Sequence, residues 1–302
     1  IPTFWGCNYA VHFTDCFSKA SFVYLLFKKS DVARSMKEFV EFAARLGITI
    51  KKFHTDAENV YVGDDSDFKK SVTAMNIGLS NSAPYCHWQN GVVERKIMTL
   101  LRRAFIMIAQ SNCPNELWGA ALQYAAMCTN CLPTASIKWQ TPYELWFHKH
   151  PNFEYFQVFG CKAVANVDID NRQNFVKPPA IYGTFIGLES YEAMSTYKVL
   201  EYTGAGLGEV LERGDVKFFQ QLDPDNFLNR VLNDTVMQEY IDAADYVKIS
   251  KPSQEIMVQD EPTKATQSAD DYDFSEALDS QISQDELGEA EKTVALSKMD
   301  VP

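Results

Sequence analysis

The sequence lacks several features that would define its class at once. No signal peptide opens its 302 residues, and no run of 18 or more apolar residues could span a bilayer, so we expect a soluble protein. No second cysteine pair accompanies Cys128 and Cys131 at zinc-finger spacing, so their C-x-x-C predicts helix packing. No Lys-Ser or Lys-Thr follows the glycines of 203–209, which favours a hairpin turn over a phosphate-binding loop.

Positive charge is scarce overall, but the deficit lies at one end of the chain. The formal net charge is −12. Residues 221–302 carry 19 acidic against 6 basic residues, whereas residues 1–220 carry 21 against 22. The first 220 residues are therefore compatible with a polyanionic partner. We expect residues 223–302 to be an acidic, mostly disordered linker, with at most a transient helix near 276–297.

Hydrophobic periodicity predicts an α/β domain over residues 1–152. Two β-branched and aromatic runs predict an antiparallel hairpin, and the helix that follows has Ser30 as its N-cap and Gly47 just past its C-terminus. The predicted elements are strands at 8–17 and 21–28, a helix within 30–47, a strand ending at Asp56, a helix near 66–75, a strand at 77–81, and helices at 92–111 and 114–133.

Beyond residue 152 the hydrophobic period changes from 3.6 to two. Short β-branched and aromatic runs alternate with Gly, Pro and Asn, which predicts a small all-β domain, a barrel, over residues 153–222. The predicted strands lie within 156–167, 180–189, 196–202 and 214–219.

Glu94 opens the helix at 92–111. At 100° per residue, the apolar residues of this helix form one stripe, Glu94 lies at the edge of that stripe, and Arg95 and Arg102 form a basic strip beside it. An acid in a first helical turn gains only about 0.3–1 kcal/mol from the helix dipole. Glu94 taken alone therefore predicts no more than a solvated helix end.

Asp56 changes the interpretation of Glu94. It ends a predicted strand, and ligands of α/β folds gather beyond the carboxyl ends of strands. Carboxylates from a strand end and a helix start can share Mg²⁺ with phosphate oxygens. Two such ions support in-line displacement at phosphorus. The pair Asp56 and Glu94 therefore predicts a metal site for phosphoryl-transfer chemistry.

Four runs of the chain occur in the same order as the corresponding motifs of one known family. They are HTDAENVY with Asp56, SAPYCHWQNGVVERK with Glu94, TPYELWFHKHPNFEYFQVFGC and ERGDVKFF. Together they resemble the integrase region of copia-type LTR retrotransposon polyproteins, over about residues 1–220. Asp56 resembles the second Asp of that family's D,D(35)E triad, and Glu94 its Glu.

The resemblance implies an RNase H-like α/β fold, a mixed sheet with flanking helices, followed by the small barrel. It implies two Mg²⁺ or Mn²⁺ ions, 3′-end processing and strand transfer, with Asp56 and Glu94 as catalytic metal ligands. It also implies DNA contacts by Gln89, Asn90, Arg95 and Lys96, to which the basic strip adds Arg102. The implied partners are element and target DNA, further copies of the enzyme and a downstream reverse transcriptase, in the nucleus and in cytoplasmic virus-like particles.

The family's first catalytic Asp falls before Ile1, on a strand that is central to the sheet. We therefore expect the chain to be a fragment that lacks its first strand and is inactive in strand transfer. Asp15 is expected to be a turn residue that accepts backbone N–H groups rather than a substitute ligand. Two alternatives stay open: a catalytically dead or domesticated DNA-binding relic, and another RNase H-like nuclease or transposase.

Overall fold

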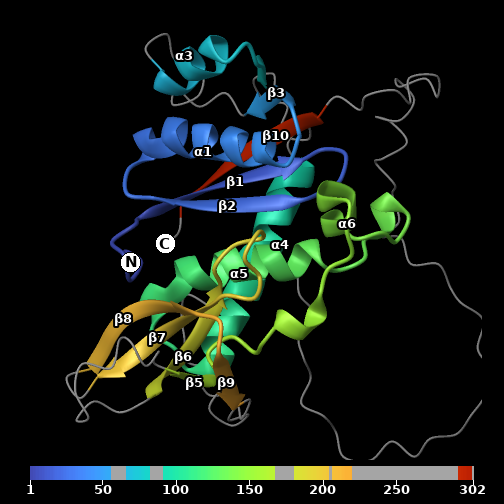
Figure 1. Ribbon diagram of the computed structural model, residues 1–302. Coiled ribbons are helices and arrows are strands. Elements are labelled where there is room, and N and C mark those ends of the chain that lie inside the picture. Colours follow the sequence, from blue (N-terminus) through green and yellow to red (C-terminus); the bar gives the residue numbers. More distant parts are fainter. Residues whose placement is uncertain (56–65, 82–90, 167–179, 204–205, 220–291, 301–302) are drawn as a thin grey trace, which may run out of the picture. The chain divides into compact units, whose positions relative to one another are not determined.

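The computed structural model describes residues 1–55, 66–81, 91–166, 180–203, 206–219 and 292–300 (Figure 1). These residues belong to one of the chain's two compact units, which comprises Ile1–Asp234 and Glu291–Pro302. The elements are β1 (Tyr9–Asp15), β2 (Ser21–Leu26), α1 (Val32–Arg45), β3 (Ile50–Thr55), α3 (Asp67–Ala74), β4 (Gly78–Asn81), α4 (Gly91–Ser111), α5 (Trp118–Asn130), α6 (Pro142–Phe147), β5 (Lys162–Asn166), β6 (Ala180–Leu188), β7 (Tyr197–Thr203), β8 (Gly206–Arg213), β9 (Val216–Phe219) and β10 (Lys292–Asp300). In the described part of the chain no helix is both long and apolar enough to cross a membrane.

The first sheet is mixed and has the strand order β2-β1-β10-β3-β4. β1 and β2 form the predicted antiparallel hairpin, and β3 and β4 are parallel. The mixed α/β sheet with flanking helices is therefore confirmed. Helix positions also follow the prediction closely, since periodic apolar residues fix where an amphipathic helix can lie.

β10 corrects two predictions. Residues 292–300 were assigned to a disordered tail, and the sheet was expected to lack a central strand. Instead β10 lies between β1 and β3, antiparallel to the first and parallel to the second (Figure 1). The prediction of disorder was based on the average composition of residues 223–302. The short run KTVALSKM within them has few charges and enough apolar residues for a strand.

Helix α1 ends as predicted but begins differently. Gly47 has φ +73°, its N–H bonds to the carbonyl of Ala44, and the N–H of Ile48 bonds to that of Ala43, which is a Schellman motif. Ser30, the predicted N-cap, instead lies inside a short 3-10 turn. The Asp31 carboxylate accepts the Lys28 N–H at 2.9 Å, so Asp31 closes this turn in its place.

One face of the first sheet packs against α1 and α6. The rings of Phe13 and Phe39 stack at 4.7 Å between centroids, and the ring of Phe22 lies 4.9 Å from that of Trp146. Phe13, Phe39 and Trp146 are fully buried. This aromatic core fixes the sheet against α1 from one side.

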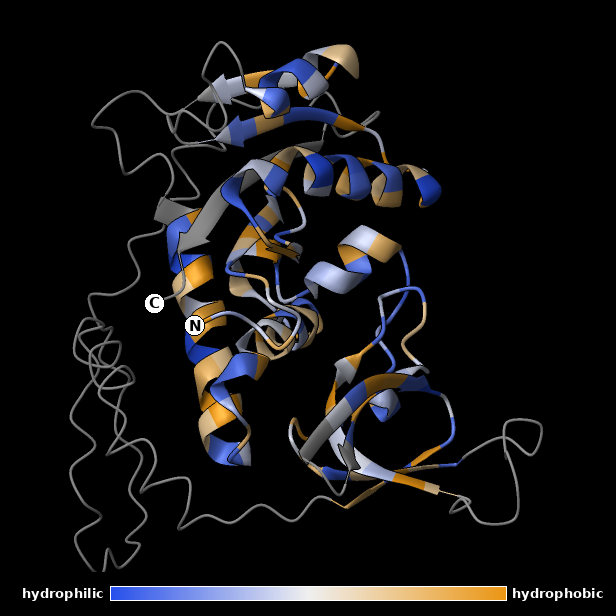
Figure 2. Ribbon diagram, turned by 90° about the vertical axis from the view of Figure 1, so that its left-hand side faces the viewer, coloured by the Kyte–Doolittle hydropathy of each residue, from blue (hydrophilic) through white to orange (hydrophobic). Residues whose placement is uncertain are grey.

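The other face packs against α4 and α5, so helices cover both faces. The long helix α4 alternates between hydrophobic and hydrophilic residues along its length (Figure 2). α5 comes so close to β2 that a Cβ on Gly119 would lie 2.7 Å from Thr3 Cγ2 and 2.8 Å from Leu25 Cδ1. Gly119 is therefore the residue that permits this close approach.

The second sheet is antiparallel, with the order β8-β7-β6-β5-β9. β7 and β8 pair as antiparallel neighbours up to Thr203↔Gly206, as expected for a hairpin, and residues 204–205 between them lie outside the described residues. β8 was not predicted as a strand, because Gly206 and Gly208 interrupt its β pattern. The five strands support an all-β domain, and its closure into a barrel stays a prediction. The division at residues 152 and 222 also stays a prediction.

Candidate metal and nucleic-acid site

Strand β3 carries the chain toward the first predicted metal ligand. It ends at Thr55, which is fully buried, and His54 Nδ1 lies 3.1 Å from Ser80 Oγ on β4. Asp56 lies outside the described residues. The structure therefore fixes where the strand ends, which is one residue before the predicted ligand.

The register of the sheet places the end of β3 level with the end of β1. Ala295 of β10 pairs with His54 on one side and with Thr14 on the other. Two strand spacings, about 10 Å, therefore separate β3 from β1 at this level. Any group that reaches Thr14 or its neighbour His12 from the helical layer is close to the end of β3.

The first turns of α4 reach that level. The Lys96 ammonium donates a hydrogen bond to the Lys19 carbonyl at 3.1 Å, in the turn that follows β1. Lys96 also lies near enough to His12 for its positive charge to lower the pKa of that imidazole. The first turns of α4 therefore lie beside the turn that follows β1.

Glu94, Arg95 and Arg102 lie on α4 as the helical wheel predicts. Glu94 is in the first turn of α4 and is exposed, as is Arg95, while Arg102 is half-buried. The apolar stripe of α4 is buried, including Val93, Ile97, Leu100, Leu101, Ala104 and Ile108. A carboxylate and, on the next residue, a guanidinium are thus exposed in the first turns of α4.

Lys96 differs from its exposed neighbours. It falls about 200° from Glu94 on the helix, so its side chain turns toward the first sheet. Burial, followed by the charges of Arg103 and Lys19, lowers the pKa of Lys96 from 10.5 to about 8. Its ammonium donates to the Lys19 carbonyl in the turn after β1, and its contact with DNA stays a prediction.

His12 is a buried base that the sequence analysis did not single out. It is fully buried on β1, and its Nε2 lies 3.0 Å from Thr14 Oγ1. Burial, followed by the charge of Lys96, lowers the pKa of His12 from 6.5 to about 3. Its place in the alternating strand predicts burial on one face, but only the fold could show that a lysine lies opposite.

The remaining predicted DNA contacts, Gln89 and Asn90, lie outside the described residues. Among the residues that the structure does describe, no group of three His, Cys, Asp or Glu side chains could hold a metal ion. The metal-ligand roles of Asp56 and Glu94 therefore stay a prediction.

Two structural interpretations are confirmed. Asp15 is fully buried, and its Oδ2 accepts the backbone N–H of Ser18 at 2.9 Å and the Ser18 hydroxyl at 2.6 Å, as expected for a turn residue. Cys128 and Cys131 lie at the end of α5 as free thiols. Burial raises their pKa values to about 11 and about 12, which makes them poor metal-binding thiolates.

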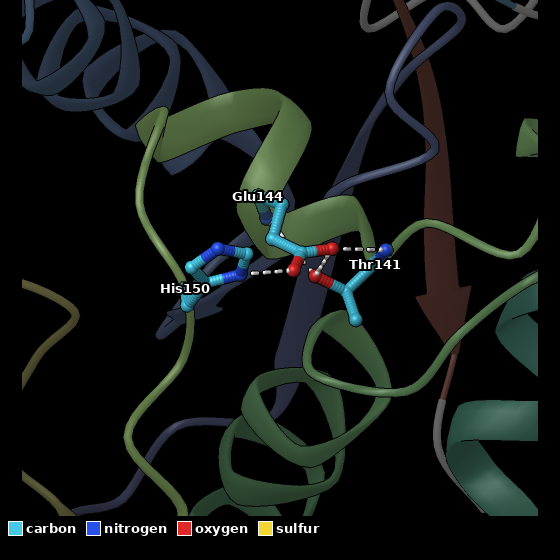
Figure 3. A network of polar contacts seen from close by, with 3 residues as sticks. All are labelled: Thr141, Glu144 and His150. Carbon is cyan, nitrogen blue, oxygen red and sulfur yellow. Dashed lines mark hydrogen bonds and ion pairs between the residues drawn. The ribbon is translucent and has the colours of Figure 1, made fainter.

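A second polar cluster, around α6, is a helix cap. The Thr141 side chain accepts the Glu144 N–H at 3.0 Å, and a carboxylate oxygen of Glu144 accepts the Thr141 N–H at 2.9 Å (Figure 3). His150 Nδ1 lies 2.5 Å from the other carboxylate oxygen. This is a capping box with an added contact to His150, and it accounts for the TPYE run without a catalytic role.

No family model matches the sequence. The chain is 27% identical over 173 residues to the retrovirus-related Pol polyprotein from transposon TNT 1-94 of Nicotiana tabacum, covering 57% of this chain and 13% of that protein. The chain is a homologue of transposon Pol polyproteins. It is also 27% identical over 157 residues to the Pol polyprotein from transposon RE2 of Arabidopsis thaliana, covering 51% of this chain and 10% of that one. These homologues confirm the resemblance to retrotransposon Pol polyproteins, and the chain spans little more than a tenth of their length.

Two solved retroviral structures were also matched. One is a simian T-cell lymphotropic virus intasome in complex with PP2A regulatory subunit B56 gamma, with a TM-score of 0.38 and 17% identity, over 70% of this chain and 72% of that chain. The other is the catalytic core domain of BIV integrase, with a TM-score of 0.33 and 21% identity, over 43% and 80%.

Proposed function

We propose that this chain is the integrase region of a transposon polyprotein, which acts within a longer polypeptide to process and join DNA ends. One observation carries the proposal. A homologue of Pol polyproteins exposes the Glu94 carboxylate, next to Arg95 in the sequence, in the first turns of α4.

The residues fit a hard divalent cation. Asp56 and Glu94 supply carboxylate oxygens, the donors that Mg²⁺ and Mn²⁺ prefer. Two ions bound there would polarise the phosphoryl oxygens and lower the pKa of an attacking water or hydroxyl group. The protein's own part is to hold Glu94 at a fixed place, which α4 does by burying its apolar stripe.

Arg95 and Arg102 are proposed to bind the phosphates of DNA, together with Gln89 and Asn90. Guanidinium groups bind phosphate oxygens through paired hydrogen bonds. Contacts of this kind position the duplex and carry little sequence information. We therefore expect salt-dependent binding with weak sequence preference.

DNA binding by this face of α4 can be tested by fluorescence anisotropy of a labelled duplex at several salt concentrations. The variant Arg95→Ala/Arg102→Ala should weaken binding about tenfold or more and reduce the slope of log K against log salt by about 2. Arg34→Ala is the matched control, since Arg34 is an exposed arginine on α1, which packs against the opposite face of the first sheet. Unchanged affinity in the double variant, or equal loss in the control, would reject the proposed DNA contacts.

The resemblance implies a triad of acids, of which Asp56 and Glu94 would supply two, so catalysis is best tested in a longer polypeptide of the kind to which the relatives belong. A chain extended upstream should join DNA ends in Mg²⁺, and Glu94→Gln should abolish this activity. Glu116→Gln, at an exposed acid just before α5, should leave it intact. Strand transfer that persists in Glu94→Gln would show that Glu94 is not a metal ligand.

A DNA-binding module without catalysis is the second candidate. It predicts that the extended chain binds DNA through Arg95 and Arg102 but joins no ends. Self-association, a reverse transcriptase in the same polyprotein, and a place in the nucleus and in virus-like particles belong to the first proposal.

A further inference from the structure

The second sheet carries two aromatic rings that do not enter its core. Tyr182 on β6 is 61% exposed, and Phe219 on β9 is 54% exposed. Phe218, the neighbour of Phe219, points to the opposite face, where its ring lies 5.5 Å from that of Phe185 in the core. The second sheet therefore has an apolar core on one side and large exposed rings on the other.

The strand register brings both exposed rings to one face. β5 pairs with β6 through Val164↔Tyr182 and with β9 through Lys162↔Phe219. Lys217 of β9 also pairs with Val164. Directly opposed residues have their side chains on the same side of a sheet, and residues two apart on a strand share a face. One face, which we call the β5–β6–β9 face, therefore carries Lys162, Tyr182, Lys217 and Phe219.

Positive charge accompanies the rings on the β5–β6–β9 face. Lys162 and Lys217 are exposed, and in the described part of the chain neither lysine forms an ion pair. At one end of the face the Asp215 carboxylate accepts a hydrogen bond from the Asn166 side chain. The face thus combines two cations with two apolar rings, which suits a polyanion that carries flat apolar groups.

The spacing of the rings allows each of them a separate partner. Tyr182 and Phe219 lie on the strands that flank β5, so about 10 Å separates them across the sheet. Their partners on β5 are two residues apart, which adds about 7 Å along the strands. The diagonal is about 12 Å. Within the described residues neither ring packs against another aromatic ring, so both rings have a face available for stacking.

We propose that the β5–β6–β9 face binds single-stranded nucleic acid. Bases stack on Tyr182 and Phe219, and the ammonium groups of Lys162 and Lys217 contact phosphates. A duplex is a poor ligand because its bases are already stacked on one another. Every base has an aromatic face, so single-stranded DNA and RNA are both ligands. This inference depends neither on the duplex contacts proposed for α4 nor on the proposed catalysis.

The stacking contacts can be tested with the 302-residue chain by fluorescence anisotropy. The probes are labelled oligothymidylate and oligouridylate of about 12 nucleotides, and a duplex of the same length. Tyr182→Ala/Phe219→Ala should weaken binding of both single strands about tenfold or more and change duplex affinity less than about twofold. Phe27→Ala, at a phenylalanine 49% exposed beyond β2, is the control. Unchanged single-strand affinity in the double variant, or an equal loss in the control, would overturn the proposal.

The phosphate contacts have a separate readout in the salt dependence. Lys162→Ala/Lys217→Ala should reduce the slope of log K against log salt by about 1.4 for a single strand, because two phosphate contacts are lost. Lys37→Ala/Lys138→Ala removes two exposed lysines outside the second sheet and should leave the slope unchanged. Equal slopes for the parent protein and the Lys162/Lys217 variant would remove the lysines from the site and overturn the assignment.

Two further measurements separate this face from α4 and from simple charge attraction. Arg95→Ala/Arg102→Ala should leave single-strand affinity unchanged even if it abolishes duplex binding. A loss equal to that of Tyr182→Ala/Phe219→Ala would assign the strand to α4 and overturn the proposal. Inorganic polyphosphate should displace the single strand less effectively, per phosphate, than unlabelled oligothymidylate. Equal displacement would show that the rings take no part in binding.

Discussion

The two sheets of this protein are built in different ways. In the second sheet, β5, β6, β7 and β8 pair in sequence order, and β9 returns to the free edge of β5. In the first sheet, a strand from residues 292–300 separates β1 from β3. The second sheet thus depends mainly on local pairings, which form at low entropic cost, whereas the first depends on one very distant pairing.

Both sheets pack against the same helical layer, so the stability of each sheet depends on the other. α4 and α5 form a single core cluster with residues of β1, β2 and the second sheet, including Ala10, Val23, Phe185 and Val199. Tyr124 on α5 donates its hydroxyl to the Gln157 carbonyl at 2.7 Å and lies 5.3 Å from the Phe185 ring. A substitution that destabilises either sheet should therefore also destabilise the packing of α5.

The largest expected effect is in the aromatic core that belongs to the first sheet alone. Trp146→Ala should lower the free energy of unfolding by about 3–5 kcal/mol, because a fully buried indole leaves a cavity against Phe22 and Phe39. Urea denaturation followed by circular dichroism measures this loss. Trp139→Ala, at a tryptophan that is 73% exposed, is the control and should change stability by less than about 0.5 kcal/mol. Similar midpoints for both variants would contradict this assignment.

The next effect is a pH dependence from the central strands. Since the pKa of His12 falls from 6.5 to about 3 on folding, the unfolded chain binds a proton between these values that the folded chain does not. Stability from this group is therefore lost as the pH falls, by about 3 kcal/mol between pH 7 and pH 4. Urea midpoints across this range should fall less steeply in His12→Gln. Parallel curves for parent and variant would show that His12 is not buried as a neutral base.

A smaller effect should come from the link between the two sheets. Asn130 is fully buried at the end of α5, its Oδ1 accepts the Ser21 N–H at 2.8 Å, and its Nδ2 donates to the Ser21 carbonyl at 2.8 Å and to Tyr191 Oη at 2.7 Å. Asn130→Ala leaves these groups without their partner and should cost about 2–3 kcal/mol in thermal or urea unfolding.

Tyr191→Phe serves as the graded control for this link. It removes only the hydroxyl, which donates to the Ser21 carbonyl at 3.2 Å, so it should cost about 1 kcal/mol. A larger loss in Tyr191→Phe than in Asn130→Ala would show that the tyrosine, not the asparagine, joins β2 to the connection between β6 and β7.

The smallest effect concerns the cap of α6. Thr141→Ala should cost about 1 kcal/mol at pH 7, the usual value of an N-cap. The Thr141 N–H, followed by His150, lowers the pKa of Glu144, so the carboxylate's contribution is present above its ordinary pKa of 4.5 and is lost as the pH falls below it. His150→Ala, at a side chain that is 92% exposed, should cost less than Thr141→Ala. Thermal unfolding of both variants at pH 7 and pH 3.5 measures these losses. A larger loss in His150→Ala than in Thr141→Ala, or losses that are the same at both pH values, would contradict this account of the cap.

The sequence by itself determined the helices, most strands and the place of Glu94. Periodicity is local, so it predicts that α4 buries one stripe and presents Glu94 and Arg95 to solvent. The turn role of Asp15 and the packing of Cys131 follow from the same kind of local pattern.

Only the tertiary structure decided which distant groups meet. β10 enters the first sheet because the slot between β1 and β3 supplies hydrogen-bonding partners on both edges, a property that no composition of residues 223–302 reveals. Lys96, a predicted DNA contact, donates to the Lys19 carbonyl because that side of α4 faces the first sheet. The physical reason is the same in both cases: pairing and burial depend on neighbours that lie far away along the chain.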